Sequence, residues 1–395
     1  MREGWKYQRL GNICKTAAGG TPLKSRKEFY ENGDIPWLRS GEVNNRNIVD
    51  CDIKITEEGL RNSSAKLFPP RTVLIAMYGA TAGQVGILNF ECSTNQAVCG
   101  ILPNDKFVPE FLYYKFLEGQ AELIKQAVGG AQPNISQEKI KNTFVPDIPL
   151  PEQKQIVSIL DKAFAAIDQA KANIERNIEN AKELLENVIS EVLDSSNNNY
   201  PLVTFDKVVK LTRGHNPPKR DFIYEPKEGY VRFYQIRDGW SDDYKVYVPD
   251  TPKLHRVNKN EILMVAYRHI GKAFRNVEGA FNVALCKITN RDNSKLDNDY
   301  LFELIPSRFI KGELLKISER SLIPSMSVKE LQKLKVPFPP IDDQKRTVKL
   351  IHAFRSDVSK IICAYERKLA HLETLRRSLL QKSFNGELTK HEVTI

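Results

Sequence analysis

The stretches Leu150-Pro-Glu-Gln-Lys154 and Ile341-Asp-Asp-Gln-Lys345 each follow a proline-rich segment and continue into a long segment without Gly or Pro. In these two segments the apolar residues correspond at a constant offset of 191, with steps of three or four residues, the spacing of an apolar stripe along a helix. The pairs are Leu160 with Ile351, Ala163 with Phe354, Ile167 with Val358, Ala170 with Ile361, Ile174 with Tyr365, Ile178 with Leu369, Ala181 with Leu372, Leu184 with Leu375 and Val188 with Leu379. Because a helix of about 40 residues with one apolar stripe needs a partner, the sequence predicts that these two helices pack together, antiparallel.

The regions before the two helices also match each other. Gly19-Gly-Thr-Pro22 corresponds to Gly214-His-Asn-Pro217, and the strand-like segment Thr72–Tyr78 corresponds to Glu261–Tyr267, each followed by a glycine-containing loop. Further pairs are Pro36–Ser40 with Arg232–Ile236, Asn95–Ala97 with Asn282–Ala284, and Gln132–Ser136 with Ile323–Ser327. Such a repeat predicts an α+β chain with pseudo-two-fold symmetry. We expect mixed α/β domains at residues 1–150 and 200–340, long helices at 151–195 and 341–390, and a polar linker at Ser195–Asn199.

Charge is spread unevenly along the 395 residues, whose net charge is +10. Residues 200–340 carry 25 Lys and Arg against 17 Asp and Glu, whereas residues 1–150 carry 18 against 16. A basic domain suits a polyanionic partner such as nucleic acid. No stretch approaches the roughly 20 apolar residues of a membrane span, no signal peptide is recognisable, and the six scattered cysteines form no CxxC pair. We therefore expect a cytoplasmic protein without a metal site.

Several of these pieces together resemble the specificity subunit of type I restriction-modification systems, along essentially the whole chain. They are Gly19-Gly-Thr-Pro22, Tyr78-Gly-Ala-Thr-Ala-Gly83, Asn95-Gln-Ala97 and Ile148-Pro-Leu-Pro-Glu-Gln-Lys154. The resemblance implies that the globular units are target recognition domains, and that each reads one half of a bipartite, asymmetric site on double-stranded DNA. It also implies that the paired helices set the spacer between the half-sites.

The same resemblance implies partners and cofactors. The helices would dock two methyltransferase subunits, which restriction subunits join. The complex would direct adenine N6 methylation and ATP-dependent cleavage of unmodified DNA. S-adenosylmethionine, ATP and Mg would be bound by the partner subunits, and this chain would hold no cofactor and carry no catalysis.

Candidate DNA-reading residues are basic, amide, hydroxyl and aromatic side chains in turn-rich stretches or beside the glycine loops. Lys and Arg supply affinity through phosphates, and side chains at base edges supply specificity. In the first domain the candidates are Lys24, Arg26, Lys27, Arg39, Ser40, Asn44, Asn45, Arg46, Tyr78 and Thr81. In the second domain they are Arg213, Lys219, Arg220, Arg232, Tyr234, Gln235, Arg237, Arg268, His269 and Lys272. Trp37, Met77 and Met264 are expected in the core.

Three motifs could suggest catalysis but fit other roles better. Asn216-Pro-Pro-Lys219 lacks the aromatic residue with which an adenine methyltransferase stacks its flipped base. The glycines at 79, 83 and 86 do not have dinucleotide-binding spacing. Asp147 with Glu152-Gln-Lys154 suits a helix start. The open alternatives are an adaptor that binds proteins, a self-sufficient methyltransferase or nuclease, and the specificity component of a related defence system.

Overall fold

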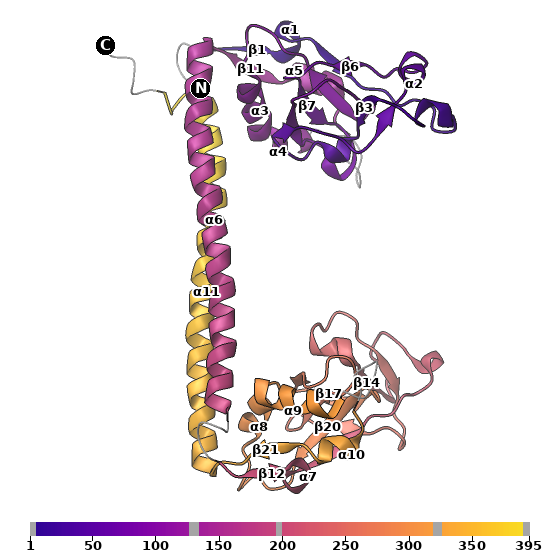
Figure 1. Cartoon of the computed structure of the whole chain (residues 1–395), viewed down its shortest axis with the longest axis vertical. Helices are drawn as coiled ribbons and strands as arrows, with labels where there is room; N and C mark the ends of the chain where they lie inside the picture. The colour runs from indigo at the N-terminus through magenta and orange to yellow at the C-terminus, as the bar shows by residue number, and fades with distance from the viewer. Residues whose placement is uncertain (1–4, 126–133, 195–199, 319–325, 390–395) are drawn as a thin grey trace. The chain divides into compact units, whose positions relative to one another are not determined.

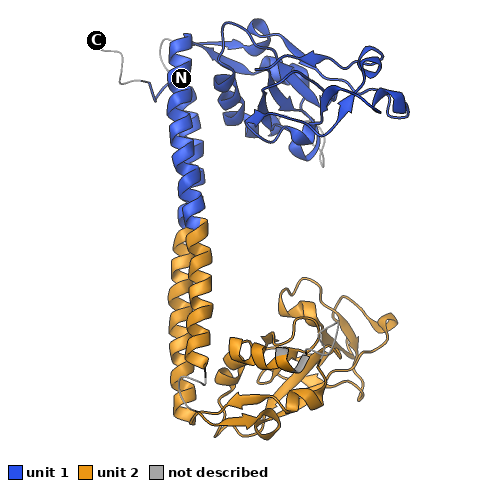
Figure 2. Cartoon of the chain, viewed as in Figure 1, with its two compact units in different colours: residues 1–174, 366–395 blue, residues 175–365 orange. Residues whose placement is uncertain are grey.

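The computed structural model describes residues 5–125, 134–194, 200–318 and 326–389. The predicted linker at 195–199 lies outside them, as do residues 132–133 and 323–325 of one matched pair. The chain divides into two compact units, which we call unit 1 (residues 1–174 and 366–395) and unit 2 (residues 175–365) (Figure 2). Each unit holds one globular part and a stretch of each long helix.

The two predicted helices are α6 (Leu150–Leu193) and α11 (Ile341–Phe384), of 44 residues each (Figure 1). In unit 1, Arg376 of α11 donates to Asp168 of α6 at 2.8 Å, and Lys171 pairs with Glu373. In unit 2, the end of α6 and the start of α11 share one apolar cluster that includes Leu193 and Ile351. The helices are therefore antiparallel within each unit, and the predicted α+β fold class is confirmed.

The helix contacts follow a slightly different stripe from the predicted one. Leu160, Ile167, Ile351 and Val358 are buried, and Ile174, Ile178, Val188, Tyr365, Leu369, Leu372 and Leu379 are half-buried. Leu184, Phe354 and Leu375 are exposed instead, at 58%, 41% and 46%. In each case the next residue, Leu185, Arg355 or Arg376, is the less exposed one. A straight helix drifts against a strict heptad pattern, so a stripe drawn at fixed steps loses register along its length.

Unit 1 contains a five-stranded sheet, ordered β2-β10-β7-β8-β4, and a four-stranded sheet, ordered β5-β3-β9-β6. All neighbours are antiparallel except β4 with β8 and β3 with β9. A two-stranded sheet of β1 and β11 leads into α6. The strands are β1 (Lys6–Arg9), β2 (Thr16–Ala18), β3 (Ile35–Leu38), β4 (Asn47–Ile48), β5 (Lys54–Ile55), β6 (Leu67–Phe68), β7 (Val73–Ala76), β8 (Val85–Leu88), β9 (Cys92–Thr94), β10 (Val98–Ile101) and β11 (Phe144–Asp147). The helices are α1 (Leu10–Ile13), α2 (Glu57–Arg61), α3 (Pro109–Glu118), α4 (Gln120–Lys125), α5 (Gln137–Asn142) and the 3-10 turns η1 (Lys27–Phe29), η2 (Ser40–Glu42) and η3 (Gly79–Thr81).

Unit 2 repeats this plan, with β13-β20-β17-β18, β15-β14-β19-β16 and β12-β21 as its sheets. Its parallel pair, β14 with β19, corresponds to β3 with β9. The strands are β12 (Leu202–Thr204), β13 (Val209–Arg213), β14 (Tyr230–Tyr234), β15 (Tyr247–Pro249), β16 (Arg256–Val257), β17 (Ile262–Val265), β18 (Ala273–Phe274), β19 (Gly279–Phe281), β20 (Leu285–Asn290) and β21 (Lys335–Pro337). The helices are α7 (Phe205–Val208), α8 (Asn298–Leu304), α9 (Arg308–Ser318), α10 (Val328–Gln332) and the turns η5 (Lys219–Asp221) and η6 (Ile236–Gly239).

The central strand of each unit serves two cores. In β7, Val73 and Ile75 join the cluster that includes α3 and α6, while Leu74 and Ala76 join the cluster next to the second sheet. β17 divides its residues in the same way. Successive side chains of a strand point to opposite faces, so a strand covered on both faces is apolar throughout. Trp37, Met77 and Met264 are buried, as predicted.

A glutamine joins each globular part to its long helix. The Gln153 amide is fully buried, donates to the carbonyls of Lys106 and Ile148 at 2.8 and 2.9 Å, and accepts from Val108 N–H at 2.9 Å. Gln344 repeats this set with Lys295 O, Pro339 O and Asp297 N–H, at 2.9, 2.8 and 2.7 Å. Because each buried amide satisfies three backbone groups, these two residues fix the start of α6 and α11 in the same way.

Candidate DNA interface

Backbone packing in unit 1 brings two loops together. A Cβ on Gly19 would lie 2.1–2.4 Å from atoms of Thr94 and Asn95, so only glycine allows the chain to pass there. Gly214 meets the backbone of Phe281 and Asn282 in the same way. The repeated Gly-x-x-Pro and Asn motifs are thus two sides of one contact. That contact places the segment after Gly19 beside Gln96, which pairs with the Thr21 hydroxyl.

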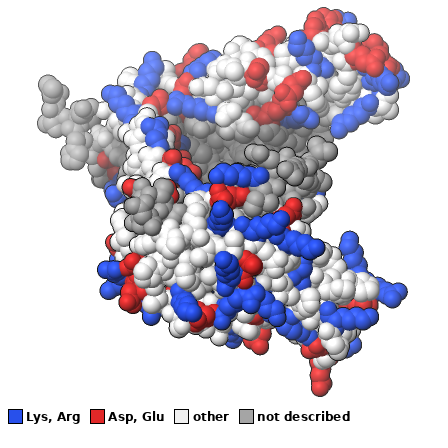
Figure 3. Space-filling model, turned by 60° about the horizontal axis from the view of Figure 1, so that its bottom comes forward, with Lys and Arg blue, Asp and Glu red and all other residues white. Residues whose placement is uncertain are grey.

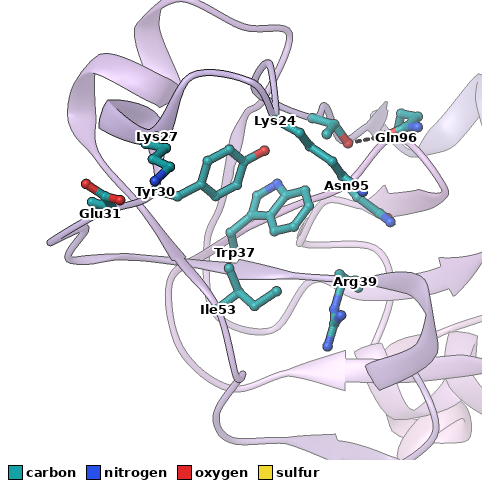
Figure 4. Close-up of a pocket in the computed structure, with 10 residues that line it drawn as sticks. Lys24, Lys27, Tyr30, Glu31, Trp37, Arg39, Ile53, Asn95 and Gln96 are labelled. Carbon is teal, nitrogen blue, oxygen red and sulfur yellow. Dashed lines mark hydrogen bonds between the residues drawn. The ribbon is translucent and has the colours of Figure 1, made fainter.

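A cavity of about 480 Å³ opens at this contact (Figure 4). Tyr30 and Trp37 meet edge to face, with ring centroids 6.1 Å apart, and their polar atoms donate to the carbonyls of Pro22 and Gly20. The lining residues are Thr21, Lys24, Lys27, Tyr30, Glu31, Trp37, Arg39, Ile53, Asn95 and Gln96. The structure therefore gathers three predicted reading residues, Lys24, Lys27 and Arg39, around one polar-edged hollow.

The other unit 1 candidates are spread over three loops. Arg26 is exposed, and its guanidinium lies 3.5 Å from the carboxylate of Glu28. The Arg39 guanidinium lies 3.5 Å from the Glu42 carboxylate and 3.7 Å from that of Asp52. Ser40, Asn44 and Asn45 are in or after η2, with both asparagines exposed. Tyr78 and Thr81 belong to the loop after β7, where Gly79 and Gly83 adopt φ of 77° and 82°. These candidates remain predictions as DNA contacts.

Arg46 has a structural role that sequence reasoning missed. Its guanidinium donates twice to Asp161 of α6, at 2.6 and 3.1 Å, and once to the Tyr114 hydroxyl at 3.0 Å. Burial opposes ionisation of Asp161, but hydrogen bonds from Arg46 and Tyr114 outweigh it and lower the pKa of this carboxyl. Burial and the bond to Asp161 raise the pKa of Tyr114. The three side chains hold β4 and α3 against the long helix.

In unit 2 the turn η6 is held by an ion pair and a capping box. The Arg232 side chain is only 10% exposed and binds Asp238 at 2.5 Å and Asp242 at 3.2 Å. Asp238 also accepts from the backbone N–H of Gln235 at 2.6 Å, which closes a capping box. Arg232 lies 4.9 Å from the Tyr234 ring centroid. Arg232, which was predicted to read DNA, therefore supports the turn, and the half-buried Tyr234, predicted likewise, lies next to it.

The remaining unit 2 candidates are mostly exposed. Arg237 follows in η6, Lys219 and Arg220 lie in η5, and Arg268, His269 and Lys272 lie in the loop between β17 and β18. Arg213 is half-buried at the end of β13. The structure brings His269 and Lys272 to the indole of Trp240, which sequence reasoning did not select. A tryptophan in a polar turn next to a glycine was the available signal.

Positive charge is prominent on unit 2. The face that Figure 3 turns toward the viewer carries many Lys and Arg side chains, with acidic side chains between them. Across the described residues no group of three or more His, Cys, Asp or Glu side chains is placed to hold a metal ion. None of the helices in the described ranges is long and apolar enough to cross a bilayer.

A family model for the type I restriction modification DNA specificity domain matches residues 2–180 and 199–363. The chain belongs to this family. Its globular parts and helices are thus those of a type I specificity subunit, a non-catalytic component that holds no cofactor of its own, and the sequence-based resemblance is confirmed.

Similar specificity subunits match along the whole chain. The MjaIX specificity subunit of Methanocaldococcus jannaschii is 24% identical over 98% of this chain and 94% of its own length. The EcoKI specificity subunit of Escherichia coli K12 is 22% identical over 98% and 90%. Among solved structures, the HsdS subunit of Thermoanaerobacter tengcongensis superposes with a TM-score of 0.59 at 18% identity, covering 97% of each chain.

A second solved chain is more similar in fold. It comes from work on complex assembly and conformational transition of the type I R-M system, and it superposes with a TM-score of 0.74. Its sequence is 18% identical, and the match covers 98% of this chain and 99% of that one. At such identity these likenesses bear on the fold alone.

Proposed function

We propose that this subunit reads a bipartite, asymmetric site on double-stranded DNA, with one half-site read by the globular part of each unit. The observation that carries this is a repeated scaffold with unlike surfaces. The sheet order and the buried glutamines recur in both units, while equivalent loop positions hold different residues. Gly79 at the start of the first glycine loop corresponds to Arg268, and Asn44 after η2 corresponds to Trp240.

We further propose that α6 and α11 dock two methyltransferase subunits, which restriction subunits join. Both helices expose large apolar side chains to solvent, and a partner that covered them would remove this apolar surface from water. These are Leu184, Leu350, Phe354, Ile361 and Leu375. In such a complex the helices set the spacer between the half-sites. S-adenosylmethionine, ATP and Mg act on the partner subunits, and the complex works in the cytoplasm, where its DNA is.

Methylome sequencing of cells with and without the gene tests this proposal. We expect an N6-methyladenine motif with two specified parts and an unspecified spacer to disappear when the gene is deleted and to return on complementation. An unchanged methylome in cells that express the partner subunits would contradict it. A motif with only one specified part and no spacer would contradict reading by both units.

A further inference from the structure

An exposed tryptophan stands at the end of η6 in unit 2. Trp240 is 48% exposed, although it follows a turn held by buried groups. Its ring meets the His269 ring edge to face at 5.5 Å, and the Lys272 ammonium lies 4.4 Å from its centroid. A cation over an indole face is favourable, so the loop between β17 and β18 holds this side chain by two contacts while leaving about half of it exposed.

The turn that leads to Trp240 is held by several contacts. The buried pair Arg232–Asp238 and the capping box at Gln235 fix η6. A Cβ on Gly239 would lie 3.0 Å from the Phe274 ring, so the turn sits directly on β18. An aromatic side chain on a fixed support loses little conformational freedom when it binds, which favours it as a contact residue.

The surroundings of Trp240 are cationic and aromatic. Arg237 lies 5.4 Å from the ring of Tyr244, which is 66% exposed, and Arg268 lies 5.6 Å from the ring of Tyr267. Asp242 is paired with Arg232 and Lys245, while Asp243 accepts from Ser241. Cations interleaved with aromatic rings suit a nucleic acid, because the cations meet phosphates and the rings meet bases.

Trp240 also belongs to one unit only. The capping box of η2, between Arg39 and Glu42, corresponds to the box of η6, between Gln235 and Asp238. By this correspondence Asn44 occupies the place of Trp240 in unit 1. A scaffold residue would be expected in both copies, whereas a residue that reads sequence is expected to differ.

We infer that Trp240 is a base-contacting residue of unit 2, whose indole packs on the methyl group of a thymine in the half-site read by that unit. The inference rests on the proposed function. Apolar contact with a thymine methyl is a way of reading an A·T pair in the major groove. Lys272 and His269 keep the ring in place, and Arg237 beside it binds a phosphate.

Photocrosslinking in the complete complex tests the inference. Thymines of the unit 2 half-site, taken from the mapped methylation motif, are replaced one at a time by 5-iodouracil in duplexes of otherwise natural sequence. Irradiation of the complex is expected to join one of these positions to Trp240, as found by mass spectrometry of digested protein. Crosslinks that fall only on residues outside the 236–244 and 267–272 loops would overturn the inference.

Binding of the same duplex by three variants completes the test. Trp240→Ala is expected to weaken binding about tenfold or more, Trp240→Phe to retain most of it, and Tyr224→Ala, which removes another exposed aromatic ring of unit 2, to bind like the wild type. Wild-type affinity in Trp240→Ala overturns the inference, as does a loss of methyltransferase association without a loss of DNA affinity. Failure of the wild-type complex to bind any duplex would overturn the proposed function itself.

Discussion

At the residue scale, the side-chain amides of Gln153 and Gln344 are buried and each makes three hydrogen bonds to the backbone. Replacing Gln153 by Leu leaves the Val108 N–H and two carbonyls without their partner in a buried site. Since each such group costs roughly 1–3 kcal/mol, we expect the free energy of unfolding of unit 1 to fall by about 3 kcal/mol or more. Gln344→Leu should do the same to unit 2.

Urea unfolding, followed by hydrogen exchange of peptides from each unit, measures this loss. Gln169→Leu is the matched control, because Gln169 is exposed on α6 and bonds only to Asn173 among the described residues. It is expected to change stability by no more than about 0.5 kcal/mol. Equal stability of the Gln153 and Gln169 variants would show that the buried amide does not hold the joint.

Arg268 has a left-handed backbone, with φ of 62°, where the first unit has Gly79. A side chain in this region costs about 1 kcal/mol, so Arg268→Gly should stabilise unit 2 by about that amount and yet weaken DNA binding. Opposite signs in a thermal melt and a DNA titration would show that the strain is retained for function. Asn276→Gly, also at φ of 62°, is the control and should leave DNA affinity unchanged.

At the scale of elements, Glu303 and Arg355 join α8 to α11. The Glu303 carboxylate is 3% exposed and receives two bonds of 2.6 Å from Arg355. Arg355→Ala leaves the buried Glu303 charge without this partner, but the Arg355 side chain is 42% exposed and solvent screens the pair, so the variant should destabilise unit 2 by about 1–2 kcal/mol. The double variant with Glu303→Gln should recover much of this loss in urea titrations, and a double variant as unstable as the single one would contradict the explanation.

Unit 1 has a different ion pair between the globular part and the helix, with Asp161 on α6 and Arg46 on the globular part. The folded-state pKa of Asp161 is lowered. Its stabilisation is therefore present above the ordinary carboxyl pKa of about 3.9 and is lost as pH falls through the lower folded value. The side chain is 40% exposed, so the contribution is no more than about 1 kcal/mol. Asp161→Asn should flatten the acid limb of the stability profile by this amount.

The exposed apolar residues of the helices give a third test at this scale. Phe354→Ser should leave the chain folded, because this ring is 41% exposed, but should reduce the methyltransferase recovered with it in affinity purification. Ile351→Ser, one turn earlier and buried, should unfold unit 2 instead. Full recovery of the methyltransferase with Phe354→Ser would place the docking surface elsewhere.

Elements with a strong periodic signal could be predicted from sequence. The helices predicted to begin at 151 and 341 begin at 150 and 341, and the segments 72–78 and 261–267 contain β7 and β17. The site was less predictable. In the sequence, Arg46 and Arg232 cannot be told apart from arginines on the surface. Only the fold shows that they form ion pairs with Asp161 and Asp238. The contacts of Trp240 with His269 and Lys272 were not predictable, because these residues are about 30 positions away in sequence.

At the scale of the whole molecule, the repeated plan predicts that reading is divided. We expect Arg268→Ala to relax the methylation motif in one half, and Arg39→Ala to relax it in the other half, each with the unaffected half unchanged. Methylome sequencing of cells with each variant makes the comparison. If one substitution relaxed both halves, the two globular parts would not read independently.

The twin glutamine joints have a consequence for how such proteins change. Each globular part is joined to its long helix by the same three hydrogen bonds of a buried glutamine, which is the fourth residue of the helix in both cases. We therefore expect that a gene fragment bounded at these two glutamines can be exchanged between the two positions, or replaced by one from a related gene, with the junction preserved. New target sites would then arise by exchange of a whole globular part rather than by successive single substitutions.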